Sequence, residues 1–113
     1  MSTLRSTTKS PLSLVRLALL VGREGLDPYS ARRSRHDFTQ PQLFAILVLR
    51  RFLRMDFRGI CQALSDWSDL RAALTLRKVP HWTTLQKAEA RLVKRGLTTG
   101  CSALWDVADA SAA

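Results

Sequence analysis

Five residues near the C-terminal end of the chain have side chains and spacing suited to binding an anion. They are Thr83, Thr84, Lys87, Arg91 and Lys94. On a helix, where successive residues are about 100° apart, Thr84 and the three cations fall on one side. Long cationic side chains can reach phosphate or guanine, and a threonine hydroxyl can donate to phosphate near a helix start. The pattern fits two interpretations, a DNA-contacting face and an ordinary solvated face.

An apolar stripe and a helix start signal occur in the same segment. Leu85, Ala88 and Leu92 recur at helical spacing on the side away from the cations. Thr83 and Gln86 have the T-x-x-Q spacing of a capping box, in which each side chain accepts a hydrogen bond from the backbone N–H of the other residue. We therefore predict a helix over 83–95 with Thr83 as its N-cap and opposite faces turned to a core and an anion.

Carboxylates do not assemble into a catalytic site. The close pairs are Asp66 with Asp69 and Asp106 with Asp109. Each pair is better explained by helix capping or surface exposure, and there is no third carboxylate or sheet to hold a metal ion. Two isolated histidines likewise give no Ser/His/Asp or Cys/His arrangement. We expect no catalytic residues, no metal ligands and no cofactor.

The two cysteines, Cys61 and Cys101, are too few and too far apart for a disulfide framework or a zinc site. Cys61 lies on an apolar helical stripe, so we predict a small core residue. The apolar run at 12–21 is too short to span a bilayer, and Arg16 interrupts it. These features predict a cytoplasmic protein with no membrane span.

Charge is the strongest feature of the composition. The 113 residues include 18 Lys and Arg against 9 Asp and Glu, which gives a net charge of +9. A strongly positive field favours an acidic partner, most of all nucleic acid, and association that weakens as salt rises. An anionic membrane surface is the weaker alternative. The length suits one small domain with a modest core.

Four further helices are predicted before the 83–95 segment. Ser10 and Pro11 start a helix that ends near Gly22 or Gly25. A central core helix opens with a Thr39–Gln42 capping box, runs through an apolar segment and has arginines in its last turn. Asp56 caps a short helix at 56–66, and Ser68 or Asp69 starts another at 68–75.

These helices predict an all-α fold, a small helical bundle containing a helix-turn-helix-like unit formed by 56–66, 68–75 and 83–95. In such a unit the last helix enters the major groove. We expect three parts: a basic N-terminal segment with one short helix and a linker at 1–37, a helical DNA-binding domain at 38–95, and a weakly ordered tail at 96–113.

Four motifs support a family resemblance. They are FTQPQL at 38–43, DFRG at 56–59, LRAAL at 70–74 and VPHWTTLQK at 79–87. Together they make the stretch from Phe38 to Leu92 resemble the N-terminal region of DDE transposases from bacterial insertion sequences. In that family this region precedes a catalytic domain whose three carboxylates bind two divalent metal ions. The region itself is thought to recognise the ends of the element.

The resemblance implies a transposase-like N-terminal fragment or remnant that binds DNA, with the inverted repeats of a mobile element as the expected target. The sequence stops before the catalytic domain, so no position inherits a DDE role and we expect no enzyme activity from this chain by itself. No small-molecule substrate is expected. The alternatives are a helical protein–protein interaction module that forms homo-oligomers through the 12–21 helix, and a degenerate remnant without activity.

Overall fold

The computed structural model describes residues 11–26, 38–95 and 104–106. Its helices are α2 (Pro11–Gly25), α3 (Gln40–Leu53), α4 (Phe57–Asp66), α5 (Ser68–Leu74) and α6 (Trp82–Arg95). The described residues contain no strand, which confirms the predicted all-α class. Nor does this part of the chain hold a helix long and apolar enough to cross a membrane.

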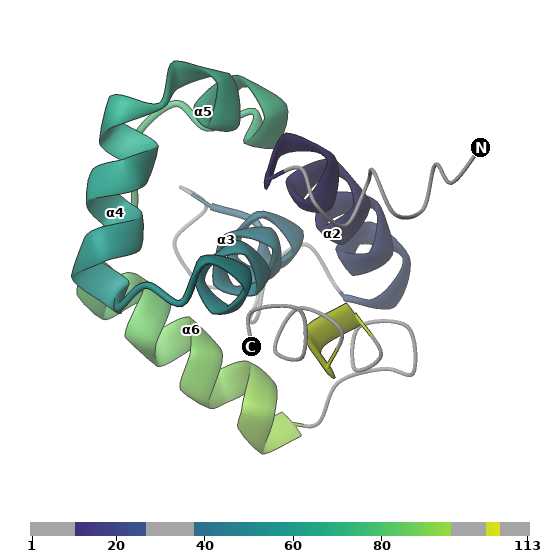
Figure 1. The fold of residues 1–113 in the computed structure, drawn as a ribbon. Coiled ribbons are helices and arrows are strands. Elements are labelled where there is room, and N and C mark those ends of the chain that lie inside the picture. Colours follow the sequence, from purple (N-terminus) through teal and green to yellow (C-terminus); the bar gives the residue numbers. More distant parts are fainter. Residues whose placement is uncertain (1–10, 27–37, 96–103, 107–113) are drawn as a thin grey trace.

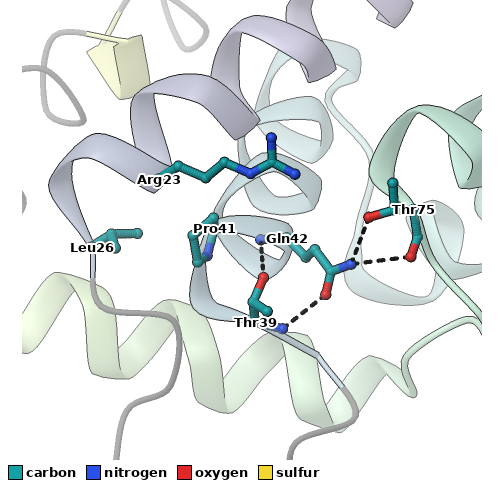
Figure 2. Close-up of a pocket in the computed structure, with 6 residues that line it drawn as sticks. All are labelled: Arg23, Leu26, Thr39, Pro41, Gln42 and Thr75. Atoms are coloured by element: carbon teal, nitrogen blue, oxygen red, sulfur yellow. Dashed lines mark hydrogen bonds between the residues drawn. The ribbon is translucent and has the colours of Figure 1, made fainter.

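Helix α3 is the central core helix, as predicted, and the other helices surround it (Figure 1). All residues from 43 to 49 are buried. The predicted capping box is confirmed: the Gln42 N–H donates to Thr39 Oγ1 at 3.2 Å, and the Thr39 N–H donates to Gln42 Oε1 at 2.8 Å (Figure 2). Because both side chains also satisfy backbone donors, the start of α3 is fixed by local sequence.

Helix α2 packs along α3 and shares its core. It begins at Pro11 and ends at Gly25, as the sequence predicts. The helices approach closely at Gly22, where an added Cβ would lie 3.1 Å from the Pro41 Cα. A larger residue at this position would push the two helices apart. The predicted cap at Ser10 lies outside the described residues.

Helices α4 and α5 are joined by Trp67 alone. Asp56 caps α4 as predicted, because the Gly59 N–H donates to its Oδ1 at 2.6 Å. Helix α5 begins at Ser68, as predicted, and follows directly from Trp67 without a side-chain cap. Arg71 instead holds the junction by donating from Nη1 to the carbonyl oxygens of Leu64 and Ser65.

Helix α6 begins at Trp82, so the prediction of Thr83 as N-cap is wrong. The His81 carbonyl oxygen accepts from the Thr84 N–H at 3.0 Å and from the Leu85 N–H at 3.3 Å. The Thr83 N–H donates to the His81 ring Nδ1 at 3.2 Å. The imidazole therefore supplies the capping acceptor, and Thr83 lies inside the first turn.

The predicted C-terminal tail contributes to the core where it is described. Leu104 and Trp105 are buried, and the Trp105 ring stacks on Phe44 with a centroid distance of 6.1 Å. The expectations for the N-terminal extension, the linker and the remaining tail fall on 1–10, 27–37, 96–103 and 107–113, which lie outside the described residues.

Candidate nucleic-acid interface

Helix α6 separates an apolar face from a cationic one. Leu85, Ala88 and Leu92 are buried, as predicted, at exposed fractions of 0%, 1% and 4%. Lys87 and Lys94 are exposed, and neither forms an ion pair within the described part of the chain. Because the apolar stripe anchors the helix, these two lysines project from a fixed support.

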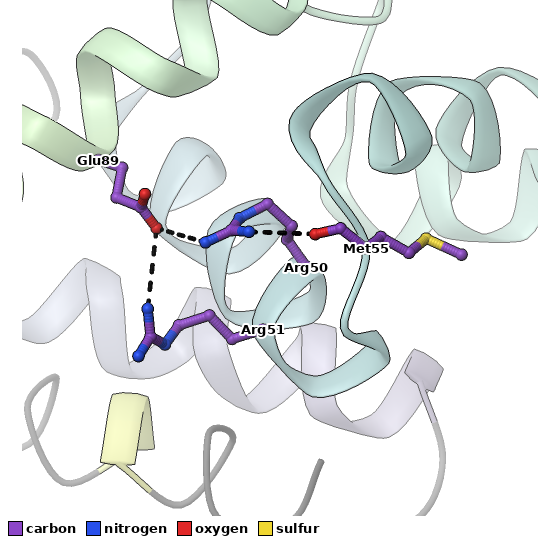
Figure 3. Close-up of polar contacts among 4 residues, drawn as sticks. All are labelled: Arg50, Arg51, Met55 and Glu89. Carbon is purple, nitrogen blue, oxygen red and sulfur yellow. Dashed lines mark hydrogen bonds and ion pairs between the residues drawn. The ribbon is translucent and has the colours of Figure 1, made fainter. Parts of the chain in front are cut away.

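The acidic residue of α6 is turned inward. Glu89 Oε1 lies 2.7 Å from Arg50 Nη2 and 4.0 Å from Arg51 Nη1 on α3 (Figure 3). Arg50 is held further by donating from Nη1 to the Met55 carbonyl oxygen at 3.0 Å, and its guanidinium lies 4.5 Å from the Phe57 ring centroid. This ion pair fastens α6 to α3.

Glu89 is the only acidic residue between 82 and 95. Its charge is used by the arginines of α3, so no carboxylate of α6 offsets the outer lysines at short range. Opposite charges within about 4–6 Å would have screened them from an anionic ligand. The exposed cations Lys87 and Lys94 are therefore not offset by a carboxylate of their own helix.

The other predicted contact residues lie on the flanks of the exposed face. Thr83, Thr84 and Arg91 are half-buried. The Thr83 hydroxyl lies 2.8 Å from His81 Nδ1, where it takes part in the helix cap. Arg91 Nε is buried and makes no hydrogen bond. Of the five predicted residues, only Lys87 and Lys94 are fully presented to solvent.

Trp82 is a packing residue. It is half-buried at the start of α6, 5.5 Å from the His81 ring between centroids. The exposed Arg58 of α4 places its guanidinium 4.8 Å from the Trp82 ring centroid. This cation–π contact adds a cation beside the N-terminal end of α6 that sequence reasoning missed.

A second cationic feature that the sequence did not reveal as a site lies at the junction of α3 and α4. An open cavity of about 510 Å³ is lined by Arg50, Arg51, Arg54, Met55 and Asp56. The only sequence signal was a cluster of arginines in the last turn of a core helix. That signal is normally explained by compensation of the negative helix end.

A smaller cavity of about 240 Å³ lies between α2, α3 and the end of α5, lined by Arg23, Leu26, Thr39, Pro41, Gln42 and Thr75 (Figure 2). Gln42 Nε2 donates to the Leu74 carbonyl oxygen at 2.9 Å and to the Thr75 carbonyl oxygen at 3.3 Å. Since its Oε1 is taken by the capping box, the Gln42 amide acts as a clasp between helices.

The helices before α6 are connected differently from a standard helix-turn-helix. The connection from α5 to α6 covers residues 75–81, which is longer than the turn of roughly three to four residues usual in that motif. Helix α6 packs against α3 and α4. The support of the cationic helix is therefore the central helix together with α4.

The sequence-predicted carboxylates and Cys61 lie apart from one another or in structural contacts in the described segments. No three His, Cys, Asp or Glu side chains in them are grouped to hold a metal ion. Asp66 accepts from Gln62 Nε2 at 3.1 Å, while Asp69 and Asp106 are exposed. Cys61 is partly buried against the core, where its thiol donates to the Pro80 carbonyl oxygen at 3.2 Å and burial raises its pKa. The raised pKa favours the protonated thiol.

Comparison with protein-family models, with curated proteins and with solved structures finds no match.

Proposed function

We propose that this chain binds DNA through the outer face of α6, as a transposase-like N-terminal fragment that recognises the ends of an insertion sequence and performs no catalysis by itself. The observation that carries the proposal is the separation of charge on α6. Lys87 and Lys94 are exposed, whereas Glu89 is paired with Arg50 on the inner side. A net charge of +9 adds a long-range attraction to any polyanion.

The transposase resemblance supports the same proposal, and several residues of its motifs cap the helices. The F-T-Q-P-Q-L motif contains the Thr39–Gln42 capping box, and the D-F-R-G motif contains the cap of α4. The V-P-H-W-T-T-L-Q-K motif covers the His81 cap and ends at Lys87. The motifs thus contain the residues that start three of the helices. Lys87 is the residue of these motifs that presents an exposed cation on α6.

The proposal is tested by removing the two exposed lysines of α6 together. Lys87→Ala/Lys94→Ala should weaken binding to duplex DNA carrying insertion-sequence inverted repeats. It should also lower the slope of log Kobs against log[salt] by about 0.9 for each lost phosphate contact. Thermal unfolding should be unchanged, because exposed side chains contribute roughly 0.5 kcal/mol or less to stability. Arg91 is left intact because its half-buried side chain would confound a folding effect with a binding effect.

A matched control removes the same charge from another helix. Arg16 and Arg23 are exposed on α2, so Arg16→Ala/Arg23→Ala changes the net charge equally. If the α2 variant lost as much affinity and slope as the α6 variant, binding would depend on overall charge and the assignment to α6 would be wrong.

Homo-oligomerisation through α2 is the second candidate function. Leu20 is 54% exposed on that helix. A single exposed leucine is common on protein surfaces, so this observation is weaker than the charge separation on α6. Sedimentation at micromolar concentration should show a dimer that Leu20→Lys converts to a monomer. A monomer in the unaltered chain would remove this candidate.

A further inference from the structure

We propose that the cavity between the C-terminal end of α3 and the start of α4 is an oxyanion site that binds a backbone phosphate of DNA. The cavity has a volume of about 510 Å³ and is lined by Arg50, Arg51, Arg54, Met55 and Asp56. This inference rests on the proposed DNA-binding function and extends it, because it adds a contact on α3 to the contacts of the α6 lysines. Its open shape suits one group of a long polyanion.

The charges around the cavity favour an anion. Its three arginines face two carboxylates, Asp56 in the lining and Glu89 from α6. Asp56 already accepts from the Gly59 N–H at 2.6 Å and is committed to capping α4. The C-terminal end of α3 and the N-terminal end of α4 meet here, so their opposite dipoles offset each other. One positive charge remains without a compensating carboxylate.

Arg54 is the residue that carries this surplus charge. Its side chain is exposed and has no hydrogen bond or ion pair with the described residues. Its backbone has a left-handed conformation with φ of 54°, at the helix C-terminal position where glycine is usual. A side chain there is strained, and residues held in strained conformations cluster at functional sites. The negative charge at the C-terminal end of α3 does not explain the presence of Arg54, since Arg50 and Arg51 already lie in the last turn.

The neighbouring arginines already bind an oxyanion within the protein. Glu89 Oε1 lies between Arg50 Nη2 and Arg51 Nη1 at 2.7 and 4.0 Å. Guanidinium groups bind phosphate with the same donor geometry that they use for a carboxylate. The ion pair with Glu89 orients Arg50 and Arg51, and Arg54 adds donors to the lining that have no partner among the described residues.

The test measures binding of the full chain to a short duplex of mixed sequence across a salt series. Arg54→Gly should weaken binding several-fold and lower the slope of log Kobs against log[salt] by about 0.9. Glycine suits the left-handed backbone at this position, so the variant should fold with an unchanged or raised Tm. Arg54→Lys should retain most of the slope.

Two control variants separate the possible causes. Thr75→Gly changes another residue with a left-handed backbone and leaves the net charge the same, and Arg16→Ala removes one positive charge from α2. Both should keep the slope of the unaltered chain. An equal loss of slope in Arg16→Ala and Arg54→Gly would overturn the site, because the effect would then come from net charge alone.

A comparison with Lys87→Ala/Lys94→Ala distinguishes failure of this site from failure of the α6 face. Loss of slope in the lysine variant alone would overturn the α3 site and leave the proposed function standing. Loss in Arg54→Gly alone would support the α3 site and contradict the α6 face. A free-phosphate site is distinguished by NMR: inorganic phosphate that shifts the Arg54 and Met55 amides, with no response of these amides to DNA, would overturn the proposal.

Discussion

The two sides of α6 use their charges for different purposes. On the inner side, Glu89 is 21% exposed and bonded to Arg50, which is 17% exposed. On the outer side, Lys87 and Lys94 are exposed, with no ion pair among the described residues. Partly buried, bonded charges contribute to stability, whereas exposed charges contribute little to it and remain available to a ligand.

Part of the positive charge of the sequence is therefore used inside the fold and is not available at the surface. Arg50, Arg51 and Arg71 are used in contacts that hold helices together. A count of 18 Lys and Arg therefore overstates the number of cations available to DNA. The cations available to bind DNA are the exposed ones that form no contact with other residues of the protein.

The largest effect on the comparison is expected from the apolar anchor of α6. Leu85 is fully buried, so Leu85→Ala should lower the free energy of unfolding by about 2–5 kcal/mol through lost burial and a new cavity. Lys94→Ala on the other side should change it by about 0.5 kcal/mol or less. Urea unfolding of the two variants measures both values, and a small effect of Leu85→Ala would show that α6 is not anchored as described.

An intermediate effect is expected at Glu89, where a substitution should lower the stability of the fold but strengthen DNA binding. Glu89→Gln should lower the free energy of unfolding by about 1–2 kcal/mol, because Arg50 loses its charged partner. DNA binding should become tighter, since the net charge rises by one and the arginines of α3 are released. Lys87→Gln is the counterpart, with stability retained and DNA binding weakened. Weaker binding by Glu89→Gln would contradict the division between the two sides.

The smallest effects are expected at Arg54 and Thr75, whose backbones are left-handed with φ of 54° and 55°. Arg54→Gly should stabilise the fold by about 0.5–1 kcal/mol, since relief of strain exceeds the added entropy of the unfolded chain. Thr75→Gly should stabilise the fold less, because it removes the Thr75 hydroxyl, which accepts a hydrogen bond from Gln42 Nε2 at 3.3 Å. Thermal unfolding in parallel compares them, and destabilisation by Arg54→Gly would reveal an undetected structural role of that side chain.

Local sequence was sufficient to predict a helix boundary only where no competing group was near. Thr39–Gln42 and Thr83–Gln86 have the same T-x-x-Q spacing, yet only the first forms a capping box. At the second, the His81 ring and carbonyl oxygen accept the N–H groups of the first turn. The competing acceptor lies two residues before Thr83, and its ring orientation could not be derived from the motif.

Periodicity predicted the buried face of α6 but not the roles of its charged residues. The spacing of Leu85, Ala88 and Leu92 was enough to identify the inner side. The pairing of Glu89 with Arg50 joins residues 39 positions apart, so it depends on how α3 and α6 cross. The half-burial of Arg91 is likewise a tertiary property that the spacing of the cations does not predict.

The central claim, that DNA lies against the outer face of α6, is tested most directly by mapping backbone amide shifts while duplex DNA is added to the full chain at low salt. We expect the largest and saturable shifts at the α6 residues from Lys87 to Lys94, with smaller shifts at Arg54 and almost none along α2. Shifts concentrated on α2, or no shifts on α6 at saturating DNA, would contradict it.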